Sequence, residues 1–253
     1  LLAKFRELYG EGASLFTSPG RINLIGEHTD YNGGFVFPGA VDKGIMAAIR
    51  PNGTERVRAW SLDMNEASEF GLGEADKPAQ SWARYIFGVC REVQKRGGRI
   101  GGFDTVFAGD VPLGAGMSSS AALESTYAFA LNELWQCGID KFELAKIGQA
   151  TEHNYCGVNC GIMDQFISAN GKKGMALKLD CATLEYELVP MNNESVSVLV
   201  LDSAVKHSLA DGAYGQRRKQ CEEASAIMGV PSLREATLEL LESFKEQLGD
   251  VRY

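Results

Sequence analysis

Residues 18–34 gather polar side chains that make directed hydrogen bonds. Within ten residues the segment holds Arg21, Asn23, Glu27, His28 and Asp30, with glycines on either side. Carboxylates accept hydrogen bonds from hydroxyl groups, whereas Arg and His donate them, so this combination is typical of a site for a polyhydroxylated ligand. The alternative is a solvated turn. Leu24 and Ile25 in the middle of the segment favour the binding site, because apolar residues draw the chain inward.

A second group is the glycine-rich loop at residues 112–124, which leads into a predicted helix. Gly114 and Gly116 let the backbone approach a ligand closely, and the serines at 118–120 open the helix. A helix N-terminus offers free N–H groups to phosphate, and serine hydroxyls add hydrogen bonds or bind Mg²⁺. The loop is neither a Walker A motif nor a dinucleotide fingerprint. A plain glycine turn with a serine cap is the alternative.

Acidic residues at the ends of two further predicted helices form the third group. Asp164 lies just after Gly161 at the start of one helix, where a carboxylate is often a simple cap or first-turn charge. Glu152 lies near the end of the preceding helix, where the dipole disfavours a negative charge, so its position indicates a metal or another cation as partner. The neighbouring His153 is more typical of a packed or surface histidine than of a ligand.

Hydrophobic periodicity predicts the elements that carry these residues. Helical spacing covers residues 82–93, 118–136, 141–155, 161–170 and 213–228, and a last helix is predicted from Ser232 with Glu235 completing a capping box. Strand-like runs cover residues 35–49, 56–61, 102–108, 174–180, 184–189 and 196–202. Strands and helices do not alternate regularly, which favours an α+β fold over a doubly wound parallel sheet. We place a lobe boundary where strands return, giving residues 1–173 and 174–253.

The composition is that of a globular protein without nucleic acid as its main partner. The 253 residues are 45% hydrophobic, outside the range of disordered chains, and the net charge of −8 argues against a nucleic-acid surface. No apolar run is long enough for a membrane helix, and the N-terminal residues do not form a signal peptide. Six scattered cysteines indicate free thiols in the cytoplasm rather than disulfides or a zinc site.

Taken together, the three groups resemble the motifs of the GHMP kinases, and within that superfamily those of the galactokinase family. Residues 20–32, which read Gly-Arg-Ile-Asn-Leu-Ile-Gly-Glu-His-Thr-Asp-Tyr-Asn, resemble the galactokinase signature. Residues 112–121 are similar to the phosphate loop of the superfamily, and residues 160–166 to the catalytic-aspartate segment. Residues 205–209 and 214–222 also match the galactokinase pattern. The resemblance covers nearly the whole chain.

The resemblance implies a two-lobed GHMP kinase fold and an activity. The N-terminal lobe would resemble domain 2 of ribosomal protein S5. The C-terminal lobe would be ferredoxin-like and incomplete, because the third, glycine-rich family motif is not found and the chain is expected to be an N-terminal fragment. The implied reaction is the ATP-dependent phosphorylation of galactose at its C1 hydroxyl, the first committed step of the Leloir pathway, with Mg²⁺ as cofactor.

The resemblance also implies roles for individual residues. Asp164 would be the general base on the anomeric hydroxyl, and Arg21 beside it would stabilise charge on the transferring phosphoryl group. The sugar would be held by Glu27, His28, Asp30, the backbone of Gly161 and the hydroxyl of Tyr214. The phosphates would be wrapped by Gly114, Ala115, Gly116, Met117, Ser118, Ser119 and Ser120. Ser120 and Glu152 would hold Mg²⁺, and Trp82 would form a wall beside adenine or simply pack in the core.

Other activities stay open at this point. The nearest alternative is a related sugar 1-kinase acting on N-acetylgalactosamine or arabinose, although Asp30 and its neighbours favour galactose. A different class is a sensor that binds sugar and ATP without catalysis, and the intact Ser-Ser-Ser-Ala-Ala run at 118–122 favours an enzyme instead. A third alternative is a chain made inactive by truncation. The sequence does not indicate an oligomeric state.

Overall fold

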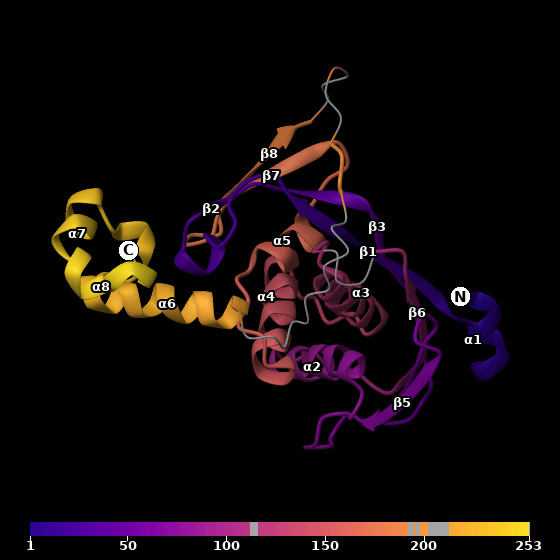
Figure 1. Ribbon diagram of the computed structural model, residues 1–253. Helices are drawn as coiled ribbons and strands as arrows, with labels where there is room; N and C mark the ends of the chain where they lie inside the picture. Colours follow the sequence, from indigo (N-terminus) through magenta and orange to yellow (C-terminus); the bar gives the residue numbers. More distant parts are fainter. Residues whose placement is uncertain (112–115, 192–194, 196–197, 202–212, 253) are drawn as a thin grey trace.

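The computed structural model describes residues 1–111, 116–191, 195, 198–201 and 213–252. These residues form a mixed sheet, a layer of helices on it and a helical arm at the C-terminal end (Figure 1). The strands are β1 (Ser14–Asn23), β2 (Phe35–Val36), β3 (Pro38–Pro51), β4 (Arg56–Ser61), β5 (Glu66–Gly71), β6 (Phe103–Gly109), β7 (Met175–Asp180) and β8 (Tyr186–Pro190). The helical segments of the main body are α1 (Leu2–Tyr9), η1 (Asp30–Asn32), α2 (Ser81–Lys95), α3 (Ser119–Leu134), α4 (Lys141–Thr151), η2 (Glu152–Cys156) and α5 (Met163–Asn170). The arm contains α6 (Ala213–Met228), η3 (Leu233–Glu235), α7 (Leu238–Ser243) and α8 (Lys245–Arg252).

The sheet runs in the order β2-β7-β3-β6-β4-β5, with β1 also paired to β3 and β8 to β7. The pairs are antiparallel, apart from the parallel pair of β4 with β6. The central strand β6 is buried from Phe103 to Phe107, and two of these residues are polar. Thr105 shares a 2.8 Å hydrogen bond with Tyr127 of α3, and Asp104 accepts from Arg58 of β4 at 2.7 Å. Buried polar groups need such partners, which here fix β6 to its neighbours.

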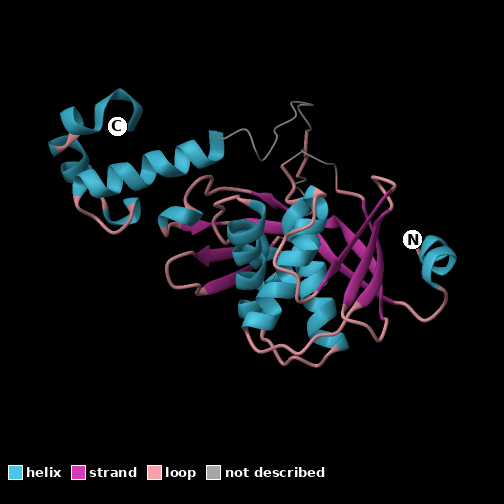
Figure 2. Ribbon diagram, turned by 90° about the horizontal axis from the view of Figure 1, so that it is seen from below, coloured by secondary structure: helices cyan, strands magenta, loops and turns pink. Residues whose placement is uncertain are grey.

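Helices α2, α3, α4 and α5 cover one face of the sheet (Figure 2). The apolar side of α2 packs with α3 and the sheet in a core that includes Ile49, Phe87 and Tyr127. A second cluster holds α5 to β7 through Phe166 and Leu177. Because α3 and α5 both contact β1, this packing brings their first turns close to the end of that strand.

Helices α6, α7 and α8 form an arm that projects beyond the main body (Figure 1). Its small core contains Ala224, Met228 and Leu248. Arg234 in η3 joins the arm to the body, because its guanidinium donates to both carboxylate oxygens of Asp180. This pairing holds the pKa of Asp180 at about 2.

Most of the predicted elements are confirmed. The predicted helices at 82–93, 118–136, 141–155, 161–170 and 213–228 correspond to α2, α3, α4 with η2, α5 and α6. The predicted strands between residues 35 and 189 correspond to β2 with β3, β4, β6, β7 and β8, and the α+β class is confirmed. Two strands, β1 and β5, are not predicted from the hydrophobic periodicity of the sequence. β1 is interrupted by Pro19 and Gly20, and β5 is an edge strand with two glutamates.

Two predictions are wrong. The last helix does not begin at Ser232, whose side chain caps no N–H group, because the backbone turns extended again at Ala236 after the short η3. Helix α7 begins at Leu238 instead, and the Thr237 hydroxyl accepts from the Leu240 N–H at 3.1 Å. The strand predicted at 196–202 is not formed at residues 198–201, which are exposed, and its other residues lie outside those described.

The lobe boundary between residues 173 and 174 stays a prediction. Strands β7 and β8 follow this point in the chain and extend the same sheet as β3, whereas the separate core of the arm begins with α6.

Candidate functional site

An arginine and an aspartate are paired where the end of β1 meets the start of α5. Arg21 Nε donates to Asp164 Oδ1 at 2.7 Å, and Nη2 donates to Oδ2 at 2.8 Å. Such two-pronged pairs are among the stronger hydrogen-bonded contacts in proteins. The register of β1 against β3 shifts between Pro19 and Arg21, and a bulge of this kind redirects the following side chain. The Asp164 side chain is 29% exposed, so a ligand can reach its carboxylate.

Ser118, which precedes α3, hydrogen-bonds to the Asp164 carboxylate rather than capping its own helix. Ser118 Oγ donates to Asp164 Oδ2 at 2.5 Å, and no side-chain cap forms at the helix N-terminus. Ser118 has a left-handed backbone with φ of 59°, which is uncommon for a residue with a Cβ and is often found at functional sites. The plain serine cap considered from the sequence therefore does not form at Ser118.

Residues 112–118, the part of the 112–121 motif that precedes α3, are called the phosphate loop below, and the end of this loop also contacts the arginine. Arg21 Nη1 donates to the Gly116 carbonyl at 2.5 Å, and the Arg21 N–H donates to the Met117 carbonyl at 3.1 Å. Gly20 permits this approach, because a Cβ there would lie 2.6 Å from the Met117 oxygen. Two residues predicted to wrap phosphates, Gly114 and Ala115, lie outside the described residues, as do residues 205–209 of the galactokinase pattern.

Glu152 is a buried carboxylate beside the first turn of α3. It opens η2, a π-helical turn that continues α4, and turns of this type are frequent at functional sites. The Ser120 hydroxyl lies beside this carboxylate. Burial raises the pKa of Glu152 to about 7; the Ser120 hydroxyl favours the charged carboxylate and opposes that rise, and the charge of Asp164 adds to it.

A second buried carboxylate, Glu124, lies one helical turn beyond Ser120. Its Oε2 accepts from Gln165 Nε2 at 3.1 Å, and its Oε1 has no partner among the described residues. Burial, together with the charge of Glu152, raises the pKa of Glu124 well above its ordinary value. No role is predicted for Glu124 from the sequence, because a glutamate within a helix carries no signal of its burial.

The residues beside Ser120 fit a magnesium ion. A hydroxyl and a carboxylate are the hard oxygen ligands that Mg²⁺ takes, and Mg²⁺ is usually held by one or two protein groups together with water and substrate phosphates. Ser120 and Glu152 supply such a pair next to the phosphate loop. Among the residues described, no cluster of three or more His, Cys, Asp or Glu side chains forms a metal cage.

The signature loop, residues 24–34, presents Glu27 and His28 at the surface. Glu27 Oε1 accepts from Asn23 Nδ2 at 2.9 Å. His28 has a left-handed backbone with φ of 61°, and its Nδ1 lies 2.6 Å from the hydroxyl of Tyr31. The His28 ring also lies against the ring of Tyr214 from α6, with the centroids 5.4 Å apart. The loop is therefore held in place from the arm as well as from the body.

Asp30 lies against the backbone of Gly161. A Cβ at position 161 would be 1.8 Å from Asp30 Oδ2, so the carboxylate fits there only beside glycine. The Gly161 N–H donates to the Tyr214 hydroxyl at 3.4 Å. Burial raises the pKa of Asp30, against the backbone N–H groups of Tyr31 and Met163, and the charge of Asp164 adds to the rise. The structure thus brings together the signature loop, the Gly161 turn and α6.

The ring of Trp82 is not exposed as a wall for an adenine ring. Only 5% of this residue is exposed; its ring packs on Phe107 with the centroids 5.3 Å apart, and its Nε1 donates to Glu66 at 2.8 Å. Stacking on a base requires a free ring face, so the proposed adenine contact of Trp82 is corrected to core packing.

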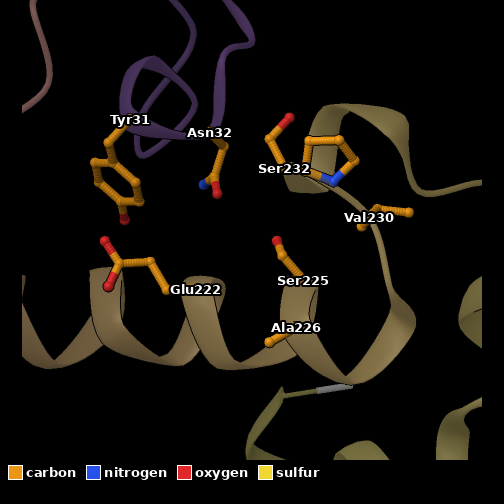
Figure 3. A pocket seen from close by; sticks show the side chains of 8 residues that line it. Tyr31, Asn32, Glu222, Ser225, Ala226, Val230 and Ser232 are labelled. Atoms are coloured by element: carbon orange, nitrogen blue, oxygen red, sulfur yellow. The ribbon is translucent and has the colours of Figure 1, made fainter.

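A cavity of about 260 Å³ lies between the signature loop and α6 (Figure 3). It is lined by Tyr31, Asn32, Glu222, Ser225, Ala226, Val230, Pro231 and Ser232. Tyr31 lines this cavity and also contacts His28, whereas Asp164 and Arg21 are not part of its lining. The cavity therefore adjoins the signature loop on the side of the arm.

Two family models match the chain. The galactokinase galactose-binding signature matches residues 3–51, and the GHMP kinases N terminal domain matches residues 84–172. The first range contains Arg21 and the signature loop. The second contains the phosphate loop, Glu152 and Asp164.

Two curated relatives and a solved structure agree with these matches. A galactokinase of Thermosipho africanus is 44% identical over 222 residues, which are 88% of this chain and 62% of the relative. A galactokinase of Clostridium tetani is 39% identical over 259 residues, covering 100% of this chain and 66% of the relative. The crystal structure of Lactococcus lactis galactokinase complexed with galactose matches with a TM-score of 0.88 and 34% identity, over 98% of this chain and 66% of that one. The chain thus spans less than two thirds of the length of the proteins it matches.

Proposed function

Because the chain belongs to the galactokinase family of the GHMP kinases, we propose that it transfers the terminal phosphoryl group of ATP to the C1 hydroxyl of galactose. The observation that carries this proposal is the Arg21–Asp164 pair, with the end of the phosphate loop bonded to it through Ser118 and Gly116. Phosphoryl transfer depends mainly on positioning and charge neutralisation, and a paired base and cation next to a phosphate-binding loop meet that need.

Asp164 is the base in this proposal. Its carboxylate accepts the hydrogen bond of the anomeric hydroxyl and takes the proton as the sugar oxygen bonds to the γ-phosphorus and the bond to ADP breaks. A positioned base of this kind contributes roughly 10²–10⁴-fold to the rate. Arg21 holds the carboxylate in orientation through two hydrogen bonds and places positive charge beside the transferring group.

The signature loop and the Gly161 turn form the sugar side of the proposed site. Glu27 and His28 are exposed, and Asp30, which lies against Gly161, is close enough to Asp164 for the charge of Asp164 to raise its pKa. A carboxylate that accepts from two neighbouring hydroxyls discriminates between epimers, because the wrong epimer leaves a buried acceptor unpaired. Asp30 is therefore the residue that we assign to the choice of galactose.

The phosphates of ATP lie at the first turn of α3 in the proposed site. The described residues Gly116, Met117, Ser118, Ser119 and Ser120 line this turn, and its N–H groups lack a side-chain cap at Ser118. Ser120 and Glu152 would hold Mg²⁺, which neutralises charge on the phosphates when bound.

We also place this activity in the cytoplasm. All six cysteines are free thiols that form no disulfide bond, which supports a reducing compartment. None of the described helices is long and apolar enough to cross a membrane.

The test is ADP release by the chain with Mg-ATP and a panel of galactose, glucose, N-acetylgalactosamine, arabinose and mevalonate. The proposal expects turnover with galactose and little with the other compounds. Preferred turnover of N-acetylgalactosamine or arabinose would assign the site to a related sugar 1-kinase. Galactose binding without turnover would identify a sensor and contradict the proposed activity.

A further inference from the structure

The segment at residues 214–222, which matches the galactokinase pattern, contains an arginine that contacts both walls of the proposed sugar site. We propose that Arg218 is a positioning residue that fixes the signature loop and the Gly161 turn relative to each other and so sets the affinity for the sugar. The inference rests on the proposed function, because it assigns a role within the same site.

One wall is the turn before α5. Arg218 Nη1 donates to the carbonyl of Asn159 at 2.9 Å and to that of Cys160 at 3.1 Å. The Cys160 carbonyl also lies 2.8 Å from His153 Nε2. The peptide before Gly161 is therefore held from the arm and from the body at once. Since Gly161 lies against Asp30, the position of this peptide decides where the Asp30 carboxylate can lie.

The other wall is the signature loop. The guanidinium of Arg218 lies over the ring of Tyr31, 5.8 Å from its centroid, which is within the range of a cation–π contact. The Tyr31 hydroxyl in turn bonds to His28 Nδ1 at 2.6 Å. The ring of Tyr31 therefore links the position of Arg218 to that of His28, a residue proposed to bind the sugar. The left-handed backbone of His28 needs such support to persist.

Neighbours on α6 hold the arginine in this orientation. Glu222, one turn further along, accepts from Arg218 Nε at 2.8 Å, and it faces Tyr31 across the cavity in Figure 3. Tyr214, one turn earlier, contacts the Gly161 N–H and the rings of His28 and Tyr31. Residues four apart share one face of a helix, so Tyr214, Arg218 and Glu222 form a single strip of α6 against the site.

The chemistry of the side chain explains why arginine stands at this position. Its planar fork can bond to two carbonyls and a carboxylate while one face rests on an aromatic ring, whereas an ammonium group offers a single nitrogen on a more flexible stem. Only a quarter of the Arg218 side chain is exposed, so these contacts are partly shielded from solvent. Among the described residues, Arg218 bonds to neither Arg21 nor Asp164, so we expect an effect on sugar binding rather than on the chemical step.

The test compares Arg218→Gln and Arg218→Lys with the control Lys219→Gln. Lys219 is the next residue of α6, and its side chain is 75% exposed, so the control removes a positive charge that faces solvent. Calorimetry would measure the Kd of galactose and, separately, that of a non-hydrolysable ATP analogue with Mg²⁺. We expect galactose to bind at least about tenfold more weakly to Arg218→Gln, with Arg218→Lys in between. The nucleotide Kd and the control should stay within about twofold of the parent chain.

Each outcome bears on the inference. Galactose affinity equal to that of the parent chain in both Arg218 variants would overturn it, and so would a parallel loss of both ligands together with a lower melting temperature, which indicates a merely structural role. If Arg218→Gln does not fold, Arg218→Lys, which keeps the charge and most of the stem, decides the question by the same comparison. A parent chain that binds no galactose would overturn the proposed function and this inference with it.

Discussion

Both oxygens of the Asp164 carboxylate accept hydrogen bonds from groups that are distant in sequence. Arg21 supplies two of them from β1, and Ser118 supplies the third from the turn before α3. A carboxylate has about four acceptor positions, so these three bonds leave one on Oδ1 for a sugar hydroxyl. The strained backbone of Ser118 places its hydroxyl for its contact with Asp164.

Gly161→Ala is predicted to weaken galactose binding. A Cβ at this position would lie 1.8 Å from Asp30 Oδ2, so the carboxylate must move from its place against the turn. We expect the Kd of galactose to rise by about tenfold or more, with nucleotide affinity unchanged, as measured by calorimetry. Gly73→Ala is the matched control, because a Cβ there meets nothing within 4 Å. An unchanged Kd in Gly161→Ala would contradict the place given to Asp30.

Glu152→Gln is predicted to change the pH dependence of stability. A raised pKa means that the folded state binds more protons than the unfolded state, so stability falls as pH rises from about 4.5 to about 7. The neutral amide avoids this loss and should stabilise the metal-free chain by about 3 kcal/mol at pH 8. Urea unfolding in the presence of a chelator would measure the difference, which should shrink toward pH 5. Equal stability at pH 8 would show that Glu152 is not held in the buried, charge-disfavouring environment described here.

Most residues of the candidate site could be predicted from the sequence, but their mutual contacts could not. Arg21, Asp30 and Asp164 lie in motifs whose polar and charged residue types indicate a binding or catalytic site. The Ser118–Asp164 hydrogen bond depends on the left-handed backbone of Ser118. The residue type serine does not indicate that conformation. Trp82 shows the converse, because a tryptophan on an amphipathic helix looks the same whether its ring packs in the core or faces a ligand.

At the scale of elements, the strand β6 depends on a buried charge. Asp104 accepts from Arg58 of β4 at 2.7 and 2.8 Å, from Arg50 of β3 at 3.1 Å and from Asn52 at 2.9 Å. Burial alone would raise the pKa of Asp104, but the hydrogen bonds of these three partners outweigh it and the pKa is lowered. One side chain therefore links three adjacent segments of the sheet.

Asp104→Asn is predicted to destabilise the fold by about 2 kcal/mol, because the buried amide replaces a carboxylate that accepts charge-assisted hydrogen bonds from two partly exposed arginines. Glu7→Gln is the control, since its pairing with Lys4 is on the surface and is worth less than about 1 kcal/mol. Urea unfolding at pH 7 measures both free energies of unfolding. A loss in Asp104→Asn no larger than that in the control would refute the structural role of this carboxylate.

The prediction of elements succeeded where local periodicity coincides with burial. Strand β4, whose side chains alternate between exposed and buried, has the predicted bounds. β1 was missed because the residues that make the site, among them Pro19, Gly20 and Arg21, interrupt the apolar pattern of a strand, and the bulge that accommodates them is a property of its pairing with β3. The helix predicted from Ser232 failed because a capping-box pattern does not ensure that the residues after it continue a helix.

At the scale of the whole molecule, the proposed site lies where the sheet, the helical layer and the arm meet. The body supplies the Arg21–Asp164 pair, Ser120 and Glu152. The arm reaches the site through Tyr214 and Arg218, which contact residues 159–161, and through Arg234, which donates to the Gly33 carbonyl of the signature loop. The arm therefore contacts the sugar side of the site, whereas the phosphate side is built by the body. This division predicts that changes on α6 act on sugar affinity and leave nucleotide affinity unaltered.

The most direct test of the proposed function is the turnover of Asp164→Asn with galactose and Mg-ATP, measured together with the Kd of galactose. We expect kcat to fall by about 10²–10⁴-fold or more, because the amide accepts no proton, while the Kd stays within about tenfold of the parent chain. Asp76→Asn, in the exposed loop before α2, is the matched control and should keep full activity. A variant Asp164→Asn that turns over galactose as fast as the parent chain would remove Asp164 from the reaction and contradict the proposed mechanism.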